Sequence, residues 1–224
     1  MRPFRMMLDR LLDLLFPPKC PFCHRIIDRG EGLYCSDCQK ELPWAVGKQG
    51  EQKPEFTAGC LSPLFYREGV REAVHRYKFQ NCPGYAKAFG LLMSQAVEDG
   101  WPKVSFDLVT WVPLSKRRLR ARGYDQARLL AEEIGERLCL PVESALQKVR
   151  HTPAQSGQAG EASRLANVLD AYALAEGAQV KGKTLLLVDD VATTGATLGE
   201  CARILRTAGA KAVYCVTLAR AGKK

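Results

Sequence analysis

The pattern of apolar and polar residues predicts strands and helices in alternation from about residue 60 onward. Short continuous apolar runs favour buried strands, whereas apolar residues repeated every three or four positions favour helices. Such alternation is typical of a mainly parallel sheet with helices on its faces, so we predict an α/β fold. The expected strands are 61–67, 106–113, 142–149, 184–188 and 212–218, and the expected helices are one holding Val70, Val74 and Tyr77 and those at 85–97, 125–138 and 196–208.

The start of the chain has a different pattern, in which apolar residues alternate with charges at helical spacing. The apolar positions are Phe4, Met7, Leu8, Leu11, Leu12, Leu14 and Leu15. They predict an amphipathic helix, which Pro17 and Pro18 end. A signal peptide or a membrane-spanning helix needs a longer unbroken apolar run, so we expect no transmembrane segment and a cytoplasmic protein. The helix either docks on its own protein, which we favour, or lies on a membrane surface, where Asp9 and Asp13 would face anionic lipid unfavourably.

Four of the nine cysteines form two C-x-x-C pairs, Cys20 with Cys23 and Cys35 with Cys38. Two tight turns at this spacing can deliver four thiolates tetrahedrally to zinc. Because cysteine fills all four positions, no site is open to water or substrate, and we expect a structural zinc ion. Redox chemistry is the alternative, but it needs only one pair, and no thioredoxin-like unit surrounds either one.

A polar stretch at 47–54, rich in Gly, Lys, Gln and Glu, follows the cysteines and has little to bury. We interpret it as a loop or linker. The expected organisation is an amphipathic helix and zinc module at 1–46, a linker at 47–59 and the α/β domain at 60–224.

Composition and charge narrow the range of partners. With 46% hydrophobic and 25% charged residues, the chain has the composition of a folded globular protein. A formal net charge of +9 favours phosphate-bearing partners, either nucleic acid or small anionic ligands. Charge alone does not separate these two classes.

The most specific chemistry lies at 185–197, where an apolar strand is followed by two acids and a small, hydroxyl-rich loop. Ligands bind at the carboxyl ends of strands in open α/β sheets, and a loop that leads into a helix can cradle a phosphate with its backbone amides. Paired carboxylates beside such a cradle fit a ribose 5-phosphate, since they accept from its 2′ and 3′ hydroxyls. The alternative is a structural role, in which the strand ends in two solvated acids before a threonine N-cap. A Walker-type nucleotide site is disfavoured, because the sequence holds no G-x-x-x-x-G-K-[ST] string. The candidate residues are Asp189, Asp190, Val191, Ala192, Thr193, Thr194, Gly195, Ala196 and Thr197.

A second candidate group follows the strand expected at 106–113 and is dense in cations. A strand end in the same sheet would bring this group to the phosphate loop, where it could bind pyrophosphate. A solvated loop is the alternative meaning of such a charge run. The residues are Pro113, Leu114, Ser115, Lys116, Arg117, Arg118, Arg120 and Arg122.

The segment 185–197 resembles the signature of type I phosphoribosyltransferases, which bind 5-phosphoribosyl pyrophosphate (PRPP) with magnesium. The resemblance implies that Asp189 and Asp190 bind the ribose and that Thr193 to Thr197 hold the 5′-phosphate. Purine-type members carry an aspartate where Thr193 stands, and that acid exchanges a proton with the base. Threonine cannot do so at neutral pH, which argues against ordinary purine salvage.

Further strings, together with the leading cysteines, resemble the ComF family. They are Tyr77-Lys78-Phe79, Pro113-Leu114 leading into Arg122-Gly123-Tyr124-Asp125-Gln126-Ala127, and Arg150, Thr152, Gln155, Arg164 and Asn167. The stretch Ser156-Gly157-Gln158-Ala159-Gly160 departs from the family pattern by being richer in glycine. The family is linked to natural transformation, in which incoming single-stranded DNA is handled in the cytoplasm, and a related branch is named for gluconate utilisation. The resemblance thus implies DNA-uptake proteins, such as a competence helicase, as partners.

Two functions remain open. In the first, which we favour, the protein binds PRPP with magnesium and tracks single-stranded DNA along 116–122, with Tyr124 and Trp111 stacking on bases. In the second, the protein is a phosphoribosyltransferase that moves ribose 5-phosphate to a nitrogenous acceptor. Magnesium and the cations would then stabilise the departing pyrophosphate.

Overall fold

The computed structural model describes residues 17–27, 32–149 and 170–222. It divides into two compact units, Met1–Leu42 and Pro43–Lys224. The amphipathic helix predicted before Pro17 and the family-like residues from Arg150 to Asn167 lie outside the described residues. Within those residues, no helix is both long and apolar enough to cross a bilayer.

Six strands in the described part of the second unit form one sheet, in the order β1-β2-β8-β7-β4, with β3 also paired to β8. Of these strands, β1 runs antiparallel to β2, and the other pairs are parallel. The predicted α/β fold with a mainly parallel sheet is therefore confirmed. The strands are β1 (Glu51–Gln52), β2 (Gly59–Leu61), β3 (Leu64–Phe65), β4 (Leu108–Trp111), β7 (Thr184–Ala192) and β8 (Ala212–Arg220).

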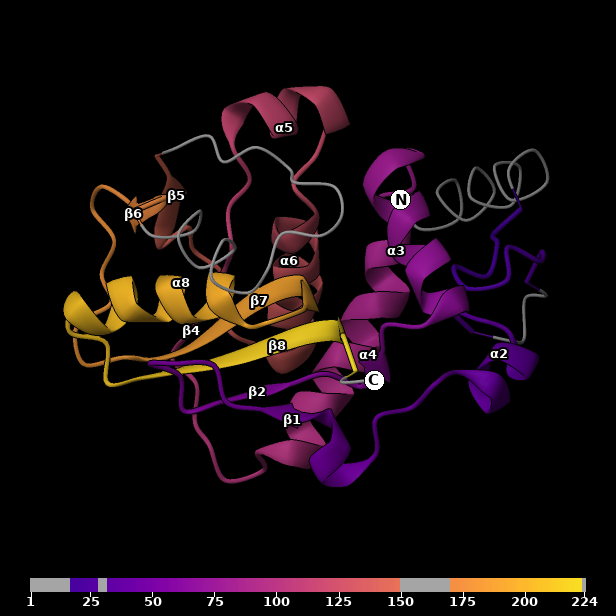
Figure 1. Cartoon of the computed structure of the whole chain (residues 1–224), viewed down its shortest axis with the longest axis horizontal. Helices are drawn as coiled ribbons and strands as arrows, with labels where there is room; N and C mark the ends of the chain where they lie inside the picture. Colours follow the sequence, from indigo (N-terminus) through magenta and orange to yellow (C-terminus); the bar gives the residue numbers. More distant parts are fainter. Residues whose placement is uncertain (1–16, 28–31, 150–169, 223–224) are drawn as a thin grey trace, which may run out of the picture. The chain divides into compact units, whose positions relative to one another are not determined.

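Helices cover both faces of this sheet (Figure 1). On β7, Leu185 and Leu187 join one buried cluster with Leu198 and Cys201 of α8. Side chains alternate along a strand, so Leu186 faces the opposite side, where α6 contacts β7 and β4 and α4 contacts β8. The helices of this unit are α3 (Glu68–Phe79), α4 (Tyr85–Gly100), α5 (Lys116–Arg122), α6 (Gln126–Leu138) and α8 (Ala196–Thr207).

Two strands differ from the sequence-based expectation. The strand expected at 61–67 is split into β2 and β3 around Pro63, which has no N–H to donate to a ladder. The strand expected at 142–149 joins the main sheet through a single bridge from Val142 to Val109. Its later part, β5 (Leu146–Lys148), instead pairs antiparallel with β6 (Tyr172–Leu174), which the sequence pattern did not predict.

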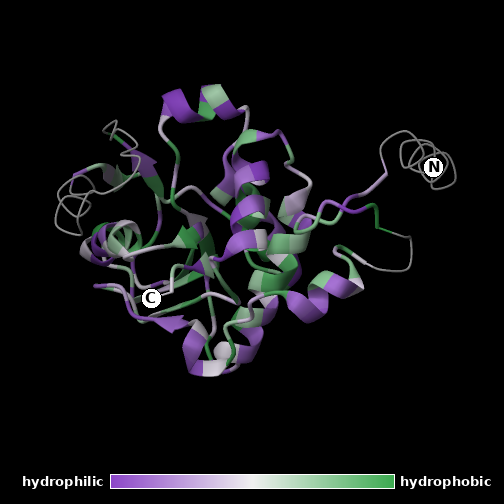
Figure 2. Cartoon of the chain, turned by 45° about the vertical axis from the view of Figure 1, so that its right-hand side comes forward, coloured by the Kyte–Doolittle hydropathy of each residue, from purple (hydrophilic) through white to green (hydrophobic). Residues whose placement is uncertain are grey.

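The stretch 47–59, which the sequence predicts as a linker, contains the 3₁₀ helix η1 (Gly47–Gly50) and strand β1. Because β1 pairs with β2, this stretch contributes an edge to the sheet. Apolar residues gather on the strands and on the helix surfaces that cover them, whereas α5 is largely hydrophilic (Figure 2).

Candidate functional site

The two predicted groups of ligand-binding residues meet at one edge of the sheet. Strands β4 and β7 run parallel with Trp111 opposite Val188, so the chain after β4 lies beside the acids of β7. A cavity of about 230 Å³ lies at this edge. Of the residues predicted from sequence, it is lined by Pro113, Leu114, Arg118, Arg122, Asp189, Asp190 and Thr197.

The stretch 116–122, interpreted from the sequence as a cationic loop, is the helix α5. The Ser115 hydroxyl accepts from the Arg118 amide at 3.3 Å, and Gly123 ends the helix with φ of 82°. Arg, Lys, Leu and Ala are good helix formers, which explains why a charged run between two such caps becomes helical. The helix directs Arg118 and Arg122, four positions apart, to the cavity.

Several predicted residues lie outside the cavity lining. Val191 and Ala192 belong to β7, which continues beyond its predicted end and pairs with β8 as far as Arg220. Ser115 caps α5. Thr193, Thr194, Gly195 and Ala196 form the loop and first turn that lead into α8, and Lys116, Arg117 and Arg120 are exposed on α5.

The two carboxylates differ in their surroundings. The Asp190 Oδ1 atom lies 2.7 Å from Lys78 Nζ, and the Asp190 amide donates to Asp189 Oδ1 at 2.8 Å. Burial, followed by the charge of Asp190, raises the pKa of Asp189 to about 8. The raised pKa means that Asp189 binds a proton more readily than a free aspartate does, and a ligand that needs the carboxylate must displace that proton.

The loop between β7 and α8 has the geometry of an anion cradle. Gly195, at the N-cap of α8, has φ of 80° and no side chain to cap the helix, so amides of the first turn point out of the helix end. The Ala196 amide donates to the Thr194 hydroxyl oxygen at 3.3 Å. A Cβ atom on Gly195 would come within 3.0 Å of Pro54 Cγ, so the chain at Pro54 lies directly against this loop.

The structure adds four polar residues that the sequence reasoning missed: Lys78, Gln126, Lys148 and Tyr172. Lys148 Nζ donates to the Tyr172 hydroxyl at 3.1 Å, and burial lowers the pKa of Lys148. Lys78 and Gln126 fall within the family-like strings, which could have identified them. Lys148 has no signal in the sequence, because only its pairing with β6 brings it to the cavity.

Hydrogen bonds hold the cavity wall in place. The Asp125 carboxylate accepts from the amides of Leu114 and Arg128, at 3.1 and 3.3 Å, and so joins the turn after β4 to the start of α6. Burial raises the pKa of Asp125. Arg122 Nη1 donates to Gln126 Oε1 at 2.6 Å.

The two aromatic residues expected to stack on DNA are both partly buried. Tyr124 donates its hydroxyl proton to the carbonyl oxygen of Tyr77, and its ring lies 5.9 Å from the Tyr77 ring, centroid to centroid. Trp111 lies on β4 within the sheet. Stacking on DNA therefore stays a prediction for both residues.

The first unit brings the four predicted zinc ligands together. The sulfur atoms of Cys20, Cys23, Cys35 and Cys38 all lie within 4.8 Å of one another. Tetrahedral zinc with Zn–S bonds of about 2.3 Å places sulfur atoms roughly 3.8 Å apart, so the cluster fits the metal. Cys35 also begins α2 (Ser36–Glu41), where its sulfur accepts from the Cys38 amide at 3.4 Å.

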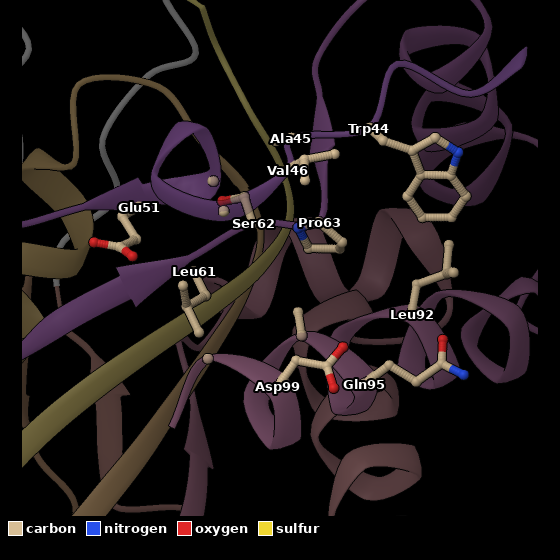
Figure 3. Close-up of a pocket in the computed structure, with 14 residues that line it drawn as sticks. Trp44, Ala45, Val46, Glu51, Leu61, Ser62, Pro63, Leu92, Gln95 and Asp99 are labelled. Carbon is tan, nitrogen blue, oxygen red and sulfur yellow. The ribbon is translucent and has the colours of Figure 1, made fainter. Parts of the chain in front are cut away.

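Another cavity, of about 480 Å³, lies between the chain at 44–51 and α4. Trp44 and Leu92 stand on one side of it and Glu51 and Leu61 on the other (Figure 3). The residues predicted for ribose, phosphate and metal are absent from its lining. It is a separate feature from the site at β4 and β7.

Two family models match parts of this chain. The family described as phosphoribosyl transferase domain matches residues 124–224, and the double zinc ribbon domain matches 11–50. The DNA utilization protein YhgH of Escherichia coli K12 is 30% identical over 90% of this chain and 89% of that protein. The chain belongs to the ComF family.

Other ComF-family relatives match over most of their length. Competence protein F of Haemophilus influenzae is 29% identical over 91% of this chain and 97% of that protein. Competence protein ComFC of Bacillus subtilis is 29% identical over 90% of this chain and 77% of that protein. The predicted family membership is therefore confirmed.

Part of this ComF-family chain is similar to solved structures. The glutamine PRPP amidotransferase of B. subtilis, complexed with ADP and GMP, is 27% identical with a TM-score of 0.41, over 59% of this chain and 26% of that chain. Adenine phosphoribosyltransferase of Thermoanaerobacter pseudethanolicus is 15% identical with a TM-score of 0.41, over 63% of this chain and 83% of that chain. The fold assignment rests on the strand order and on the domain match.

Proposed function

We propose that this ComF-family protein binds PRPP with magnesium in the cavity at the carboxyl ends of β4 and β7. The observation that carries the proposal is the convergence of two carboxylates, four cations and Thr197, in the first turn of α8, on one cavity. The charged residues are Asp189, Asp190, Lys78, Arg118, Arg122 and Lys148. A ligand with ribose hydroxyls beside phosphates needs this combination of acceptors and donors.

Each part of the ligand has a matching part of the site. Asp189 and Asp190 accept from the ribose hydroxyls, and the loop from Thr193 to Thr197 holds the 5′-phosphate with backbone amides. Arg118 and Lys148 line the same cavity, where they bind the pyrophosphate. Magnesium accompanies the pyrophosphate and neutralises part of its charge.

We further propose that α5 holds single-stranded DNA and that the protein acts in the cytoplasm during uptake or use of DNA. Arg117 and Arg120 are exposed on α5 and lie outside the cavity lining, so they remain available when PRPP is bound. The names of the relatives, which refer to competence and to DNA utilization, support this role. Other DNA-uptake proteins, a helicase among them, are the expected partners.

The zinc ion proposed for the four cysteines is structural. Four thiolates complete the tetrahedral coordination, so the metal has no open position for a reacting ligand. Its contribution is to the folding of the first unit, because metal binding by a small module supplies folding free energy.

The DNA role is tested with Arg117→Ala/Arg120→Ala. For single strands, the logarithm of the binding constant falls linearly with the logarithm of the salt concentration. The slope becomes shallower by about 0.7 for each phosphate that the protein no longer neutralises. This variant should therefore bind a labelled single strand more weakly and with a slope smaller by up to roughly 1.4, while its affinity for PRPP stays unchanged. The control, Lys103→Ala/Lys211→Ala, removes two exposed charges that precede β4 and β8, at the opposite end of the parallel strands. Equal DNA binding by all three proteins across a salt series would refute a role for α5.

A phosphoribosyl transfer reaction is the second candidate function. The observation in its favour is that Lys78 lines both the PRPP cavity and a neighbouring cavity along α3, which leaves room for an acceptor beside the ribose. Release of pyrophosphate from PRPP in the presence of a panel of nucleobases would establish this activity.

A further inference from the structure

A second cavity, of about 400 Å³, runs along α3 beside the proposed PRPP site. The two cavities share Lys78, whose amino group pairs with Asp190. The lining of the second cavity includes Tyr66, Arg71, Glu72, His75, Lys78 and Phe79. Its lining thus combines aromatic rings with Lys and Arg side chains, all within the second unit.

Phe79 is the exposed aromatic residue at the end of α3. Phe79 is 61% exposed, although phenylalanine is usually among the buried residues. The Arg122 guanidinium carbon lies 4.8 Å from the centre of the Phe79 ring, and the His75 ring lies 4.9 Å from it, centroid to centroid. Three planar groups therefore stand together at the surface, and Arg122 connects them to α5.

The charges around Phe79 suit a polyanion. Among the described residues that line this cavity, Glu72 is the one carboxylate, and its Oε2 atom lies 3.6 Å from Arg76 Nη1. Arg71 is exposed on the same cavity, and Lys78 stands at its junction with the PRPP site. A phosphate backbone can thus pass cations on both sides of the exposed ring.

We propose that Phe79, together with Arg122 and His75, is the stacking platform for one base of a single strand whose backbone runs between α5 and the cavity along α3. This inference rests on the proposed binding of single-stranded DNA and names the residue that recognises a base. Base–aromatic stacking tolerates every sequence because each base has a π face, and arginine planes stack in the same way. A protein that handles DNA of any sequence needs this kind of contact.

A base within a strand fits this platform better than a free base. Pockets for small molecules bury roughly 70–90% of their ligand, which requires walls around it. Phe79 is instead open on the rim, where a base can enter while it stays attached to neighbouring nucleotides. The partly buried Tyr124 and Trp111 offer less accessible ring surface at this site.

The test compares Phe79→Ala and Phe79→Trp with the parent in titrations of a labelled oligonucleotide and of the same oligonucleotide made abasic. We expect Phe79→Ala to lose about tenfold in affinity for the normal strand, with the salt slope unchanged, because stacking releases no counterions. Phe79→Trp should retain the affinity and show stronger fluorescence quenching on binding than the parent, whose own three tryptophans give the baseline. The abasic strand should bind the parent and Phe79→Ala equally.

The outcomes separate this inference from the broader proposal. If Phe79→Ala matches the parent while Arg117→Ala/Arg120→Ala weakens binding, the platform is wrong and the DNA role of α5 stands. If free nucleosides quench Phe79→Trp as strongly as the oligonucleotide at equal base concentration, the occupant is a small acceptor, and the strand proposal is overturned. If the parent binds no single-stranded DNA at low salt, both proposals fail.

Discussion

At the scale of single residues, the surroundings of Asp189 favour the protonated form of its carboxyl group. The usual pKa of an aspartate is 3.8, and burial together with the neighbouring Asp190 raises the pKa of Asp189 to about 8. The folded protein therefore keeps this proton at pH values at which the unfolded chain has lost it. The contribution of Asp189 to the free energy of unfolding is therefore fully present below about pH 4, and it is lost as the pH rises to about 8.

Binding of PRPP should release that proton, because a ribose hydroxyl needs the ionised carboxylate as acceptor. Below pH 8 the affinity for PRPP with magnesium should rise with pH by up to about tenfold per unit, and it should level off above pH 8. Calorimetry at pH 7 in buffers of different ionisation enthalpy should report the release of roughly one proton. The absence of proton release at pH 7 would show that Asp189 does not accept from the ligand in its ionised form.

The backbone conformation of Gly195 determines the shape of the proposed phosphate loop. Its φ of 80° is costly for any residue with a Cβ, and a Cβ there would also meet Pro54 at 3.0 Å. Gly195→Ala should lower the free energy of unfolding by about 1–2 kcal/mol and weaken PRPP binding, since the amide cradle shifts. Gly177→Ala is the matched control, because Gly177 also has positive φ, of 76°, but no atom within 4 Å of its Cβ position. If both variants keep full PRPP affinity, the loop is not the phosphate cradle.

At the scale of elements, the long periodic segments were predictable and the short paired ones were not. Helices α4, α6 and α8 begin where expected, to within a residue, because apolar periodicity over three turns or more is a strong signal. Strand β6 has three residues, and its partner β5 precedes it across a long stretch of chain, so no local pattern reveals the pair. Lys148 reaches the cavity only through that pairing.

The helix α5 illustrates the same limit for the site. The cations at 116–122 and their position after β4 were visible in the sequence, but their conformation depends on the caps at Ser115 and Gly123. Because side chains point in different directions around a helix, some of these cations face the cavity and the others are exposed. A loop without a regular repeat would not separate the cations in this way. The exposed position of Phe79 was equally invisible, because a phenylalanine in an amphipathic helix is expected to be buried.

The zinc module is the element with the sharpest sequence signal, and its metal content is directly measurable. Cys35→Ser removes one of the four ligands but leaves a hydroxyl that can still cap α2, so any effect reports on the metal: the purified variant should lose its zinc and the first unit should loosen. Elemental analysis and limited proteolysis check both effects. Cys139→Ser, at an exposed cysteine outside the cluster, should keep one zinc per chain. Full zinc occupancy in Cys35→Ser would contradict the assignment.

At the scale of the whole molecule, the two proposed anion sites both lie in the second unit. The residues proposed to bind ribose and pyrophosphate line one cavity at the carboxyl ends of β4 and β7, and α5 keeps other cations exposed. Lys78 joins this cavity to the groove along α3. A nucleic acid strand and a phosphoribosyl ligand can thus occupy adjacent parts of one surface, which is the arrangement expected of a DNA-handling protein that senses a metabolite.

The central claim is that this cavity binds PRPP, and thermal unfolding with PRPP and magnesium tests it most directly. A ligand at a hundred times its Kd stabilises the folded state by about 2.7 kcal/mol, so the parent should unfold at a clearly higher temperature with the ligand than without it. Glu136→Gln/Glu143→Gln, which neutralises two exposed acids, should show the same increase. Asp189→Asn/Asp190→Asn should show no increase. An equal ligand-dependent increase in that double variant, or none in the parent, would contradict the account.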